Sequence, residues 1–529
     1  MFRRITTHIN NNTINVTSAK SSISSIGDIR ISIKSFGGDI RSIRSFNSIG
    51  SIRYCNHNNN NNIYNNGLFN NNFFGRRGEI KQISKISTSN LPTMGEPSQA
   101  DVLQRRKLGS RIFILNRPKV LNALDLGMIR TMTPQLQAWK ESDLCKVIIL
   151  KAAGDTAFCA GGDVKRVILD EENGKHEEAV KFFEEEYQLN HLIATINKPF
   201  VSIMNGITMG GGVGLSVHGP FRIATEKTVF AMPEAKIGFF PDVGGSFFLP
   251  RLDGQIGTYL ALTGFQLKGL DVFYAGIATH YVPSNRLAFL EERLSEIECD
   301  DNEVINMAIE DYVFESNKDH VYSLSGDVRK AIDRCFKFES VEEIIEALEA
   351  ENTEWATKTK KTILSLSPTS LKVTLNALRK GKKKVITDCF KMEFILAQKF
   401  LENSDFKRGV RALLIDKPSK KPEWDPSTLS NFTEFFNDAK IGGVQELKLL
   451  ANISYETYPF SKFNLPSEEE IRKVVTGESP EAGSLSMTKN DVVHFFNENR
   501  RGKIGVTEKV LEVLNRKTDI KGDELNWII

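Results

Sequence analysis

Residues 227–251 read KTVFAMPEAKIGFFPDVGGSFFLPR and place two acids, Glu234 and Asp242, in a stretch that is otherwise mostly apolar or rich in glycine and proline. An acid in apolar surroundings needs an explanation, because burying an unpaired charge is costly. A strand is expected just before Glu234, over TVFAM at 228–232. Since a Gly- and Pro-containing turn separates the two acids, Asp242 is expected to return to the pocket that holds Glu234.

Two glycine-rich loops precede this segment. They are TAFCAGGDVK at 156–165 and NGITMGGGVGLSVHG at 205–219. Backbone N–H groups can bind a ligand where no side chain blocks the approach, and the start of a helix leaves several of these donors free. If the two loops converge, they form an oxyanion hole. Each loop alone is also compatible with an ordinary turn.

Short β-rich runs alternate with segments of helical periodicity after about residue 101. The expected strands are RIFIL (111–115), KVIIL (146–150), FVSIM (200–204), FRIAT (221–225) and TVFAM (228–232), and the expected helices include 121–139, 176–196 and one near Gly211. This order predicts a largely parallel sheet with helical crossovers. After about Gly254 the sequence is helical.

The first ninety residues have a different composition. They carry twelve Lys and Arg against three acids, and residues 58–72 are mostly asparagine. So little continuous apolar surface cannot offset the entropy of ordering the chain. The basic, serine-rich and acid-poor beginning is typical of a mitochondrial transit peptide, with a disordered basic tail as the alternative.

The overall composition excludes several classes of protein. The net charge of +3 arises from 69 basic and 66 acidic residues, so no global field favours nucleic acid or a membrane surface. The six cysteines, at 55, 145, 159, 299, 335 and 389, form no CxxC pair, which argues against a disulfide framework and a zinc site. There is no apolar run of eighteen residues. We expect no metal and no redox cofactor.

Taken together, the segments AFCAGGDVK, NGITMGGGVGLS, FAMPEAKIGFFPDVGGSFFLPRL, ALTG and AGIATHYV resemble the crotonase (enoyl-CoA hydratase/isomerase) superfamily. SPTSLKVT and GVRALLIDK are similar to its hydrolase branch, and the resemblance covers about residues 103–437. It implies an α/β fold, a spiral of ββα repeats followed by a helical subdomain. The implied substrate is a short 3-hydroxyacyl thioester of coenzyme A (CoA), from branched-chain amino acid breakdown in the mitochondrial matrix.

The resemblance also implies roles for individual residues. The amides of Gly162 and Gly211 would form the oxyanion hole, Glu234 and Asp242 would be catalytic, and Glu186 would contact the substrate. Hydratases of the superfamily carry a second glutamate at the position of Gly214, so water addition to a double bond would lack one of its acid–base groups. Glu234 would act on water as a general base or attack the thioester directly.

Structural alternatives exist for two of these acids. Asp242 could cap a turn, and Glu186 belongs to an EEE run, which on a helix usually faces solvent. The acyl group's 3-hydroxyl would bind Asp242 or Glu186.

Weaker assignments concern CoA and the remaining polar residues. Ala123 belongs to LNAL (121–124), which matches the segment that lines the adenine pocket in the superfamily, and Arg117, Lys119 and Lys165 are candidates for its phosphates. The histidines 191, 218 and 280 are interpreted as structural, and Cys159 as a packing residue.

These patterns divide the chain into four parts. They are a leader and spacer (1–92), a catalytic core (101–295), a helical subdomain (296–437) and a helical C-terminal extension (438–529). The extension contains a helix over 465–477 with Ser467 as N-cap, and two more within 487–525.

Similar tails occur in relatives that resemble mitochondrial ribosome subunits, so a ribosome-associated protein is the rival function. A sister thioesterase or hydratase is the third. Neither direct nucleic-acid nor membrane binding is expected, and the oligomeric state is left open.

Overall fold

The structure of the protein is a computed structural model, which describes residues 3–9, 12–18, 100–313, 320–425, 435–436, 443–481, 487–521 and 524–528. The chain divides into two units, Met1–Pro92 and Thr93–Ile529. In the first unit, β1 (Arg3–Ile9) and β2 (Asn12–Ser18) form an antiparallel pair. The expected asparagine-rich spacer lies outside the described residues. Among the described helices, none has the length and apolar character needed to cross a bilayer.

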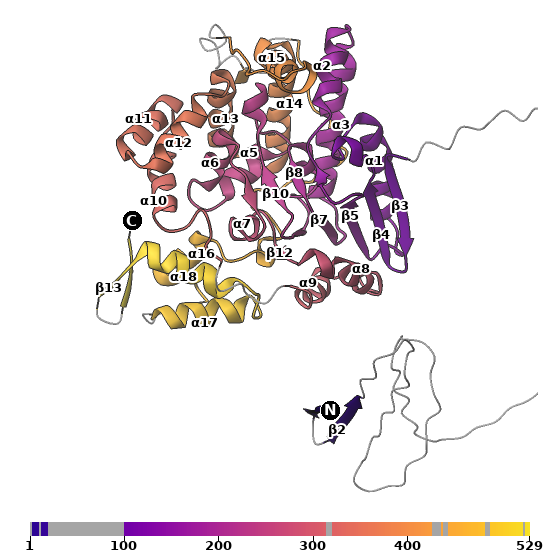
Figure 1. Cartoon of the computed structure of the whole chain (residues 1–529), viewed down its shortest axis with the longest axis vertical. Coiled ribbons are helices and arrows are strands. Elements are labelled where there is room, and N and C mark those ends of the chain that lie inside the picture. The colour runs from indigo at the N-terminus through magenta and orange to yellow at the C-terminus, as the bar shows by residue number, and fades with distance from the viewer. Residues whose placement is uncertain are drawn as a thin grey trace, which may run out of the picture. The chain divides into compact units, whose positions relative to one another are not determined.

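The second unit contains two sheets whose strands alternate along the chain (Figure 1). The six-stranded sheet has the order β12 (His280–Tyr281), β9 (Phe221–Ala224), β7 (Phe200–Met204), β5 (Val147–Ala152), β4 (Ser110–Leu115) and β3 (Val102–Lys107). The four-stranded sheet has the order β11 (Leu267–Lys268), β10 (Val229–Ala231), β8 (Ile207–Met209) and β6 (Ala157–Cys159). All neighbours are parallel except β3 with β4 and β10 with β11. From β5 to β10 the chain thus adds one strand to each sheet in turn, which is the expected spiral of ββα turns.

The central strands are apolar throughout because both faces of the large sheet are covered. On β4, Phe113 and Leu115 point into the main core, whereas Ile112 and Ile114 point into a second cluster. Leu290 of α8 (Leu287–Ser295) and Ile305 of α9 (Asn302–Glu310) cover this second cluster. Such strands have near-continuous hydrophobic sequences, as RIFIL and KVIIL do.

The remaining helices pack around the sheets and then form a helical layer. Near the sheets are α1 (Leu126–Lys140), α2 (Val164–Glu172), α3 (His176–Ala194), α4 (Gly211–Gly214), α5 (Gly245–Phe248), α6 (Ile256–Thr263) and α7 (Leu270–Tyr274). The layer contains α10 (Gly326–Cys335), α11 (Val341–Glu351), α12 (Glu354–Ile363), α13 (Pro368–Gly381), α14 (Ile386–Glu402), α15 (Ser404–Val410) and a π-helix (Arg411–Ile415).

Two expected helices differ from their observed bounds. The helix expected over 121–139 begins at Leu126, because Leu121 and Asn122 have positive φ and Asp125 caps the helix by accepting from the Met128 amide at 2.9 Å. The helix expected near Gly211 is only the four-residue α4, which lies directly after the β8 strand. The strands expected at 111–115, 146–150, 200–204, 221–225 and 228–232 are observed, with ends shifted by up to two residues.

The C-terminal extension is packed onto the body (Figure 1). It contains α16 (Glu468–Val475), α17 (Lys489–Asn499), α18 (Val506–Lys517) and a hairpin of β13 (Thr518–Lys521) and β14 (Glu524–Trp527). Ser467 caps α16 in a capping box with Glu470, as expected. The hairpin was not anticipated. Ile471 of α16 and Val510 of α18 are buried in the main core cluster, so the extension shares its hydrophobic core with the body.

Buried ion pairs fix the extension in place. Arg329 of α10 is 1% exposed and donates to Glu468 at 2.8 Å, and Lys509 donates to Asp253 at 2.6 Å. Arg222 of β9 donates to Tyr458 Oη at 2.6 Å and to Asn464 Oδ1 at 2.7 Å. The basic RRGK link (500–503) is also engaged, through pairs to Glu470, Glu303 and Glu310.

Candidate active site

Two backbone amides meet at the start of α4. The Asp163 amide and the Gly161 carbonyl bond to Leu124, at 2.8 and 2.9 Å, so the intervening Gly162 amide faces the other way. A Cβ atom built on Gly211 would lie 3.1 Å from the Gly162 nitrogen, which places the two glycines side by side. Within the described residues, neither amide donates to a protein acceptor. The two predicted oxyanion donors are therefore adjacent and free.

Two carboxylates face this pair of amides. Glu234 is at the first position of a 3-10 helix (Glu234–Ile237) that follows β10, and its Oε1 would be 3.0 Å from a Cβ built on Gly210. Glu186 projects from α3, and its Oε1 would be 2.5 Å from a Cβ on Gly211. Only glycine at these positions allows the carboxylates to come so close to the backbone.

The third acid, Asp242, is held by Tyr187 of α3, whose hydroxyl donates to Asp242 Oδ2 at 2.8 Å. Asp242 is 5% exposed, Glu234 6% and Glu186 2%. Glu186 is therefore a buried side chain of the EEE run, and the solvent-facing alternative is wrong. Asp242 bonds to a side chain at the site rather than only capping a turn.

The carboxyl groups are strongly perturbed. Burial raises the pKa of Asp242 to about 7, although the Tyr187 hydrogen bond opposes this rise. Burial and the charge of Asp242 raise the pKa of Glu234 well above its usual range, and burial, Asp242 and Glu234 do the same to Glu186. In the described part of the chain no basic side chain forms an ion pair with any of the three. Like charges in a dry pocket cannot all ionise, so the cluster retains protons near neutral pH.

Two of these carboxyl groups have an oxygen that finds no hydrogen-bond partner in the described part of the chain. They are Oε2 of Glu234 and Oε1 of Glu186, and both are buried. Buried polar atoms are normally paired, so unpaired carboxyl oxygens in a cluster that adjoins two free amides indicate a site for substrate or water. The arrangement can hold developing negative charge on the amides while a carboxylate supplies or activates an attacking oxygen.

A second layer fixes the loop that carries Asp242. Glu393 of α14 accepts hydrogen bonds from the Gly244 amide at 2.7 Å and from the amide and hydroxyl of Ser246. His218 donates to the Val243 carbonyl at 2.7 Å, and burial lowers the pKa of His218 to about 4. His218 is thus neutral and structural, as expected.

Sequence reasoning missed Tyr187, Asn190 and Glu393. Tyr187 and Asn190 follow Glu186 by one and four positions on α3, so the only available signal was helical proximity to a residue already suspected. Glu393 lies 151 positions after Asp242 and nothing local connects them. Cys159 is buried beside the Gly161 carbonyl, and burial raises the pKa of Cys159 to about 12, which fits a packing role.

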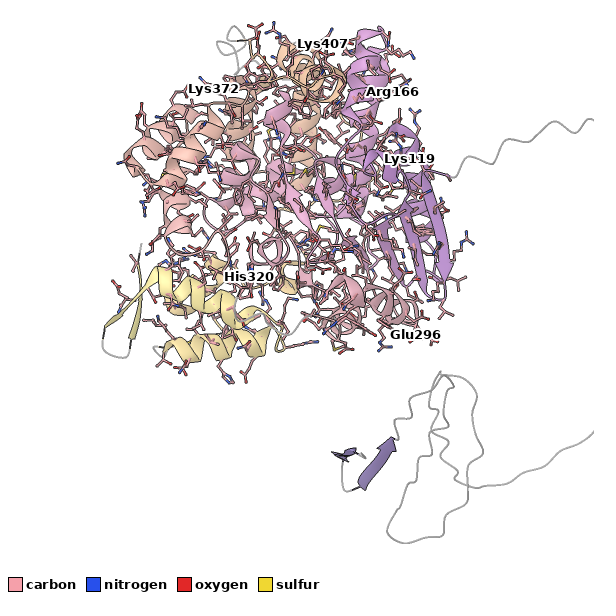
Figure 2. All side chains as sticks on the ribbon, viewed as in Figure 1. Lys119, Arg166, Glu296, His320, Lys372 and Lys407 are labelled. Atoms are coloured by element: carbon pink, nitrogen blue, oxygen red, sulfur yellow. The ribbon has the colours of Figure 1, made fainter. Side chains whose placement is uncertain are left out.

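The residues expected to contact CoA lie outside the carboxyl cluster. Arg117 donates to the Ala123 carbonyl at 2.7 Å and pairs with Asp125 and Asp163, so its charge is already neutralised. These three charged residues line a pocket of about 560 Å³ that also includes Arg166 and Phe182. Lys165 is exposed on α2, and Figure 2 shows Lys119 and Arg166 at the surface on the side that carries α1 and α2. A second pocket, of about 580 Å³, includes Pro233 and Ala235 on either side of Glu234 in the chain.

A fold of ββα turns with two free amides and a buried carboxyl cluster defines a crotonase-type site. The family profile for enoyl-CoA hydratase/isomerase matches residues 110–439. The chain therefore belongs to the enoyl-CoA hydratase/isomerase family.

Particular relatives narrow this assignment. The chain is 45% identical to the small ribosomal subunit protein mS47 of Neurospora crassa, over 83% of this chain and 90% of that protein. It is 49% identical to the mitochondrial 3-hydroxyisobutyryl-CoA hydrolase of Homo sapiens, over 66% of this chain and 90% of that protein. Among solved structures, a carnitinyl-CoA dehydratase from Mycobacterium thermoresistibile aligns with a TM-score of 0.61 at 34% identity, over 67% of this chain and all of that chain.

Proposed function

We propose that this chain hydrolyses the thioester of 3-hydroxyisobutyryl-CoA, and of 3-hydroxypropionyl-CoA, to the free hydroxy acid and CoA. The observation that carries the proposal is the unpaired, buried Glu234 carboxyl group at the free amides of Gly162 and Gly211. Relatives named 3-hydroxyisobutyryl-CoA hydrolase, mitochondrial, are 43% to 49% identical and support the substrate and the mitochondrial location. The reaction would serve valine breakdown in the matrix.

The proposed mechanism uses the site as follows. The thioester carbonyl oxygen accepts hydrogen bonds from Gly162 and Gly211, which stabilise the negative charge of the tetrahedral intermediate. Ionised Glu234 removes a proton from water, the water oxygen bonds to the carbonyl carbon, and the C–S bond breaks. The thiolate leaves as CoA and takes a proton from a protonated carboxyl group of the cluster. In the alternative route Glu234 attacks directly, and water then cleaves the mixed anhydride.

Hydroxylamine separates the two routes. An anhydride on Glu234 would be trapped as a hydroxamate, which peptide mass spectrometry would locate at that residue. General-base catalysis through water leaves Glu234 unmodified under the same turnover conditions. This chemistry needs only groups that the chain supplies, and we propose that no metal or redox cofactor takes part.

We propose that the CoA part lies along the pocket lined by Arg117 and Arg166, which adjoins the Gly162 loop. Because Arg117 is paired with two aspartates and Arg166 with Asp170, the exposed Lys119 and Lys165 are better candidates for the phosphates. Ala123 remains a candidate for lining the adenine pocket, with its carbonyl already accepting from Arg117.

The decisive experiment is a thiol-release assay on the wild type and on Glu234→Gln. The substitution keeps the shape but removes the base, so kcat should fall by roughly a factor of 10³. Wild-type kcat should rise with pH, because Glu234 acts in its ionised form and its pKa lies above the usual range. Glu185→Gln is the control, since Glu185 pairs with Arg130 outside the site. Equal turnover of Glu234→Gln and wild type would refute the assignment.

Crotonyl-CoA distinguishes hydrolysis from hydration. Solved hydratase structures lie among the structural neighbours, including an enoyl-CoA hydratase from Rhodobacter sphaeroides with a TM-score of 0.58 at 31% identity, over 66% of this chain and all of that chain. Gly214 provides no acid for water addition. Faster hydration of crotonyl-CoA than thiol release from the hydroxyacyl thioesters would reverse our conclusion.

A second candidate function is membership of the mitochondrial small ribosomal subunit. The match to mS47 spans 469 residues, whereas that to the human hydrolase spans 352, so the ribosomal relative also matches beyond the catalytic body. Sedimentation of mitochondrial extract through a sucrose gradient tests this candidate. Comigration with the small subunit would support it, and a free peak of low mass would remove it.

A further inference from the structure

Asn190 is a buried side chain whose hydrogen-bonding capacity is entirely unused. It lies on α3 with 0% exposure, and neither Nδ2 nor Oδ1 has a hydrogen-bond partner among the described residues. An amide that is buried without partners loses its hydrogen bonds to water and gains none in return. Such a group lowers the stability of the fold, so a ligand that pairs with it is the physical explanation for its presence.

The position of Asn190 relates it to the carboxyl cluster. It follows Glu186 by four residues, so both side chains lie on one face of α3. Glu186 meets Gly211 of α4, and Asn190 meets Gly214 one turn later, where a built Cβ would be 2.6 Å from Oδ1. The same Cβ would be 2.7 Å from Val243, the neighbour of Asp242. The amide therefore lies between α4 and the Asp242 loop.

We propose that Asn190 is a specificity-determining residue that binds the hydroxyl of the acyl group. A hydroxyl is both donor and acceptor, and an amide can satisfy both functions through Oδ1 and Nδ2. Because Gly214 carries no side chain, the Asn190 amide can pack directly against the α4 backbone, next to the loop that carries Asp242. This inference rests on the proposed thioester hydrolysis and adds the group that selects hydroxylated substrates.

The test compares two thioesters that differ only in the hydroxyl. The ratio of kcat/KM for 3-hydroxyisobutyryl-CoA to that for isobutyryl-CoA is measured for the wild type and for the near-isosteric Asn190→Leu. Because a site that hydrogen-bonds a hydroxyl rejects the analogue that lacks it, the wild type should prefer the hydroxylated substrate and the variant should lower the ratio at least about ten-fold. An unchanged ratio, with both activities falling together, would overturn the proposal.

Binding makes the test independent of hydrolysis. Calorimetry with non-hydrolysable thioether analogues of the two substrates should show the same loss of discrimination in Asn190→Leu. If the wild type releases no thiol from either thioester, the proposed function fails. The ratio of the two thioether affinities then still decides the role of Asn190, and an unchanged ratio in the variant refutes it.

Stability supplies a further comparison, with an asparagine whose side chain is fully paired and whose positive φ adds to the cost of replacing it by leucine. Asn122 is equally buried, but its Nδ2 donates to the carbonyls of Ala153 and Ala157, at 3.0 and 2.8 Å, and its Oδ1 accepts from the Arg117 amide at 2.8 Å. In the ligand-free protein, Asn122→Leu should lower Tm, whereas Asn190→Leu should leave Tm unchanged or raise it. A comparable fall in Tm for Asn190→Leu would identify it as a structural residue and overturn the proposal.

Discussion

At the scale of single residues, Glu186, Glu234 and Asp242 share a dry site without a basic partner among the described residues. Water solvates carboxylates far better than an apolar interior does, so the folded protein binds protons more tightly than the unfolded chain. The cluster therefore destabilises the folded state as the pH rises. This instability is the cost of having a reactive carboxylate available at neutral pH.

Asp242→Asn should stabilise the protein in a pH-dependent way. The pKa of Asp242 is raised to about 7 in the folded state from a usual value of 3.8. Below about pH 4 both states are protonated and the substitution changes little. Between pH 4 and 7 the unfolded chain releases the proton and the folded chain retains it, so the wild type loses stability with pH. The difference in free energy of unfolding between Asp242→Asn and the wild type should grow by roughly 2–3 kcal/mol between pH 5 and 7 and then level off. Urea unfolding of both proteins at pH 5, 7 and 8 measures this difference. A stabilisation that does not depend on pH would contradict the raised pKa.

Gly211→Ala should impair turnover far more than folding. The new Cβ would be 2.5 Å from Glu186 Oε1, so the carboxyl group must move and the approach to the Gly162 and Gly211 amides is blocked. Loss of one oxyanion donor typically costs about 10²–10³ in kcat. Steady-state kinetics with a thermal melt separate the two effects. Gly174→Ala is the control for kcat: no described atom lies within 4 Å of its Cβ position, and its φ of +72° makes it lower Tm through backbone strain without reaching the site. Normal kcat in Gly211→Ala would remove Gly211 from the oxyanion hole.

Much of the site was predictable at this scale, because glycine and acid positions are visible in the sequence. Gly162, Gly211 and Glu234 stand in loops whose composition already indicates special backbone or charge requirements. Burial of Glu186 could not be predicted from its EEE run, since it depends on how α3 packs against α4. The unpaired state of Asn190 is a property of its three-dimensional surroundings and has no local signal.

At the scale of elements, the docking of α16 and α18 depends on buried ion pairs with the helical layer. Glu468 accepts from Arg329 at 2.8 Å and from Arg516 at 2.9 Å, and Arg329 also donates to Asp333 at 3.2 Å. Breaking a buried pair is expensive because the remaining charge stays desolvated. The basic and acidic residues of the extension therefore fix its orientation on the body.

Arg329→Met should lower the free energy of unfolding by about 3 kcal/mol, because it leaves Glu468 and Asp333 with fewer partners. Urea denaturation measures the change. The neighbouring Lys330→Met serves as control, since Lys330 and Asp327 form an exposed pair expected to contribute about 0.5 kcal/mol or less. Equal urea midpoints for Arg329→Met and Lys330→Met would show that the ion pairs of Arg329 do not hold the extension on the body.

The central strands were predictable because continuous apolar runs such as FVSIM are typical of strands covered on both faces. The helix near Gly211 was expected, but its length of only four residues was not, and the β13–β14 hairpin was missed, because four-residue elements carry too few periods for a pattern to emerge. The spiral arrangement itself followed from the resemblance, since alternation of strands and helices suits several α/β folds equally well.

At the scale of the whole molecule, the extension and the body form one folded unit from Thr93 to Ile529. Truncation after residue 437 would remove Tyr458, Asn464 and Glu468, the partners of Arg222 and Arg329. It would also expose the core that Ile471 and Val510 cover. The truncated chain should lose more than about 5 kcal/mol of stability, a large part of the total for a typical protein. Circular dichroism melts and gel filtration would show this, whereas a truncated protein with an unchanged Tm would prove the extension to be an independent appendage.

The hydrogen bonds of Arg222 also have a consequence for how the protein is made. This arginine lies on the inner strand β9, but its guanidinium group reaches Tyr458 and Asn464, which are 236 and 242 positions later in the chain. A nascent polypeptide emerges from its amino end, so the strand is complete long before its partners exist. Until then the guanidinium group has only the carbonyls of Gly219 and Ile277 as partners, and its other N–H groups are left to water. The final packing around β9 is thus completed only in the last stage of synthesis, and the partly finished polypeptide should be a client of chaperones for most of that time.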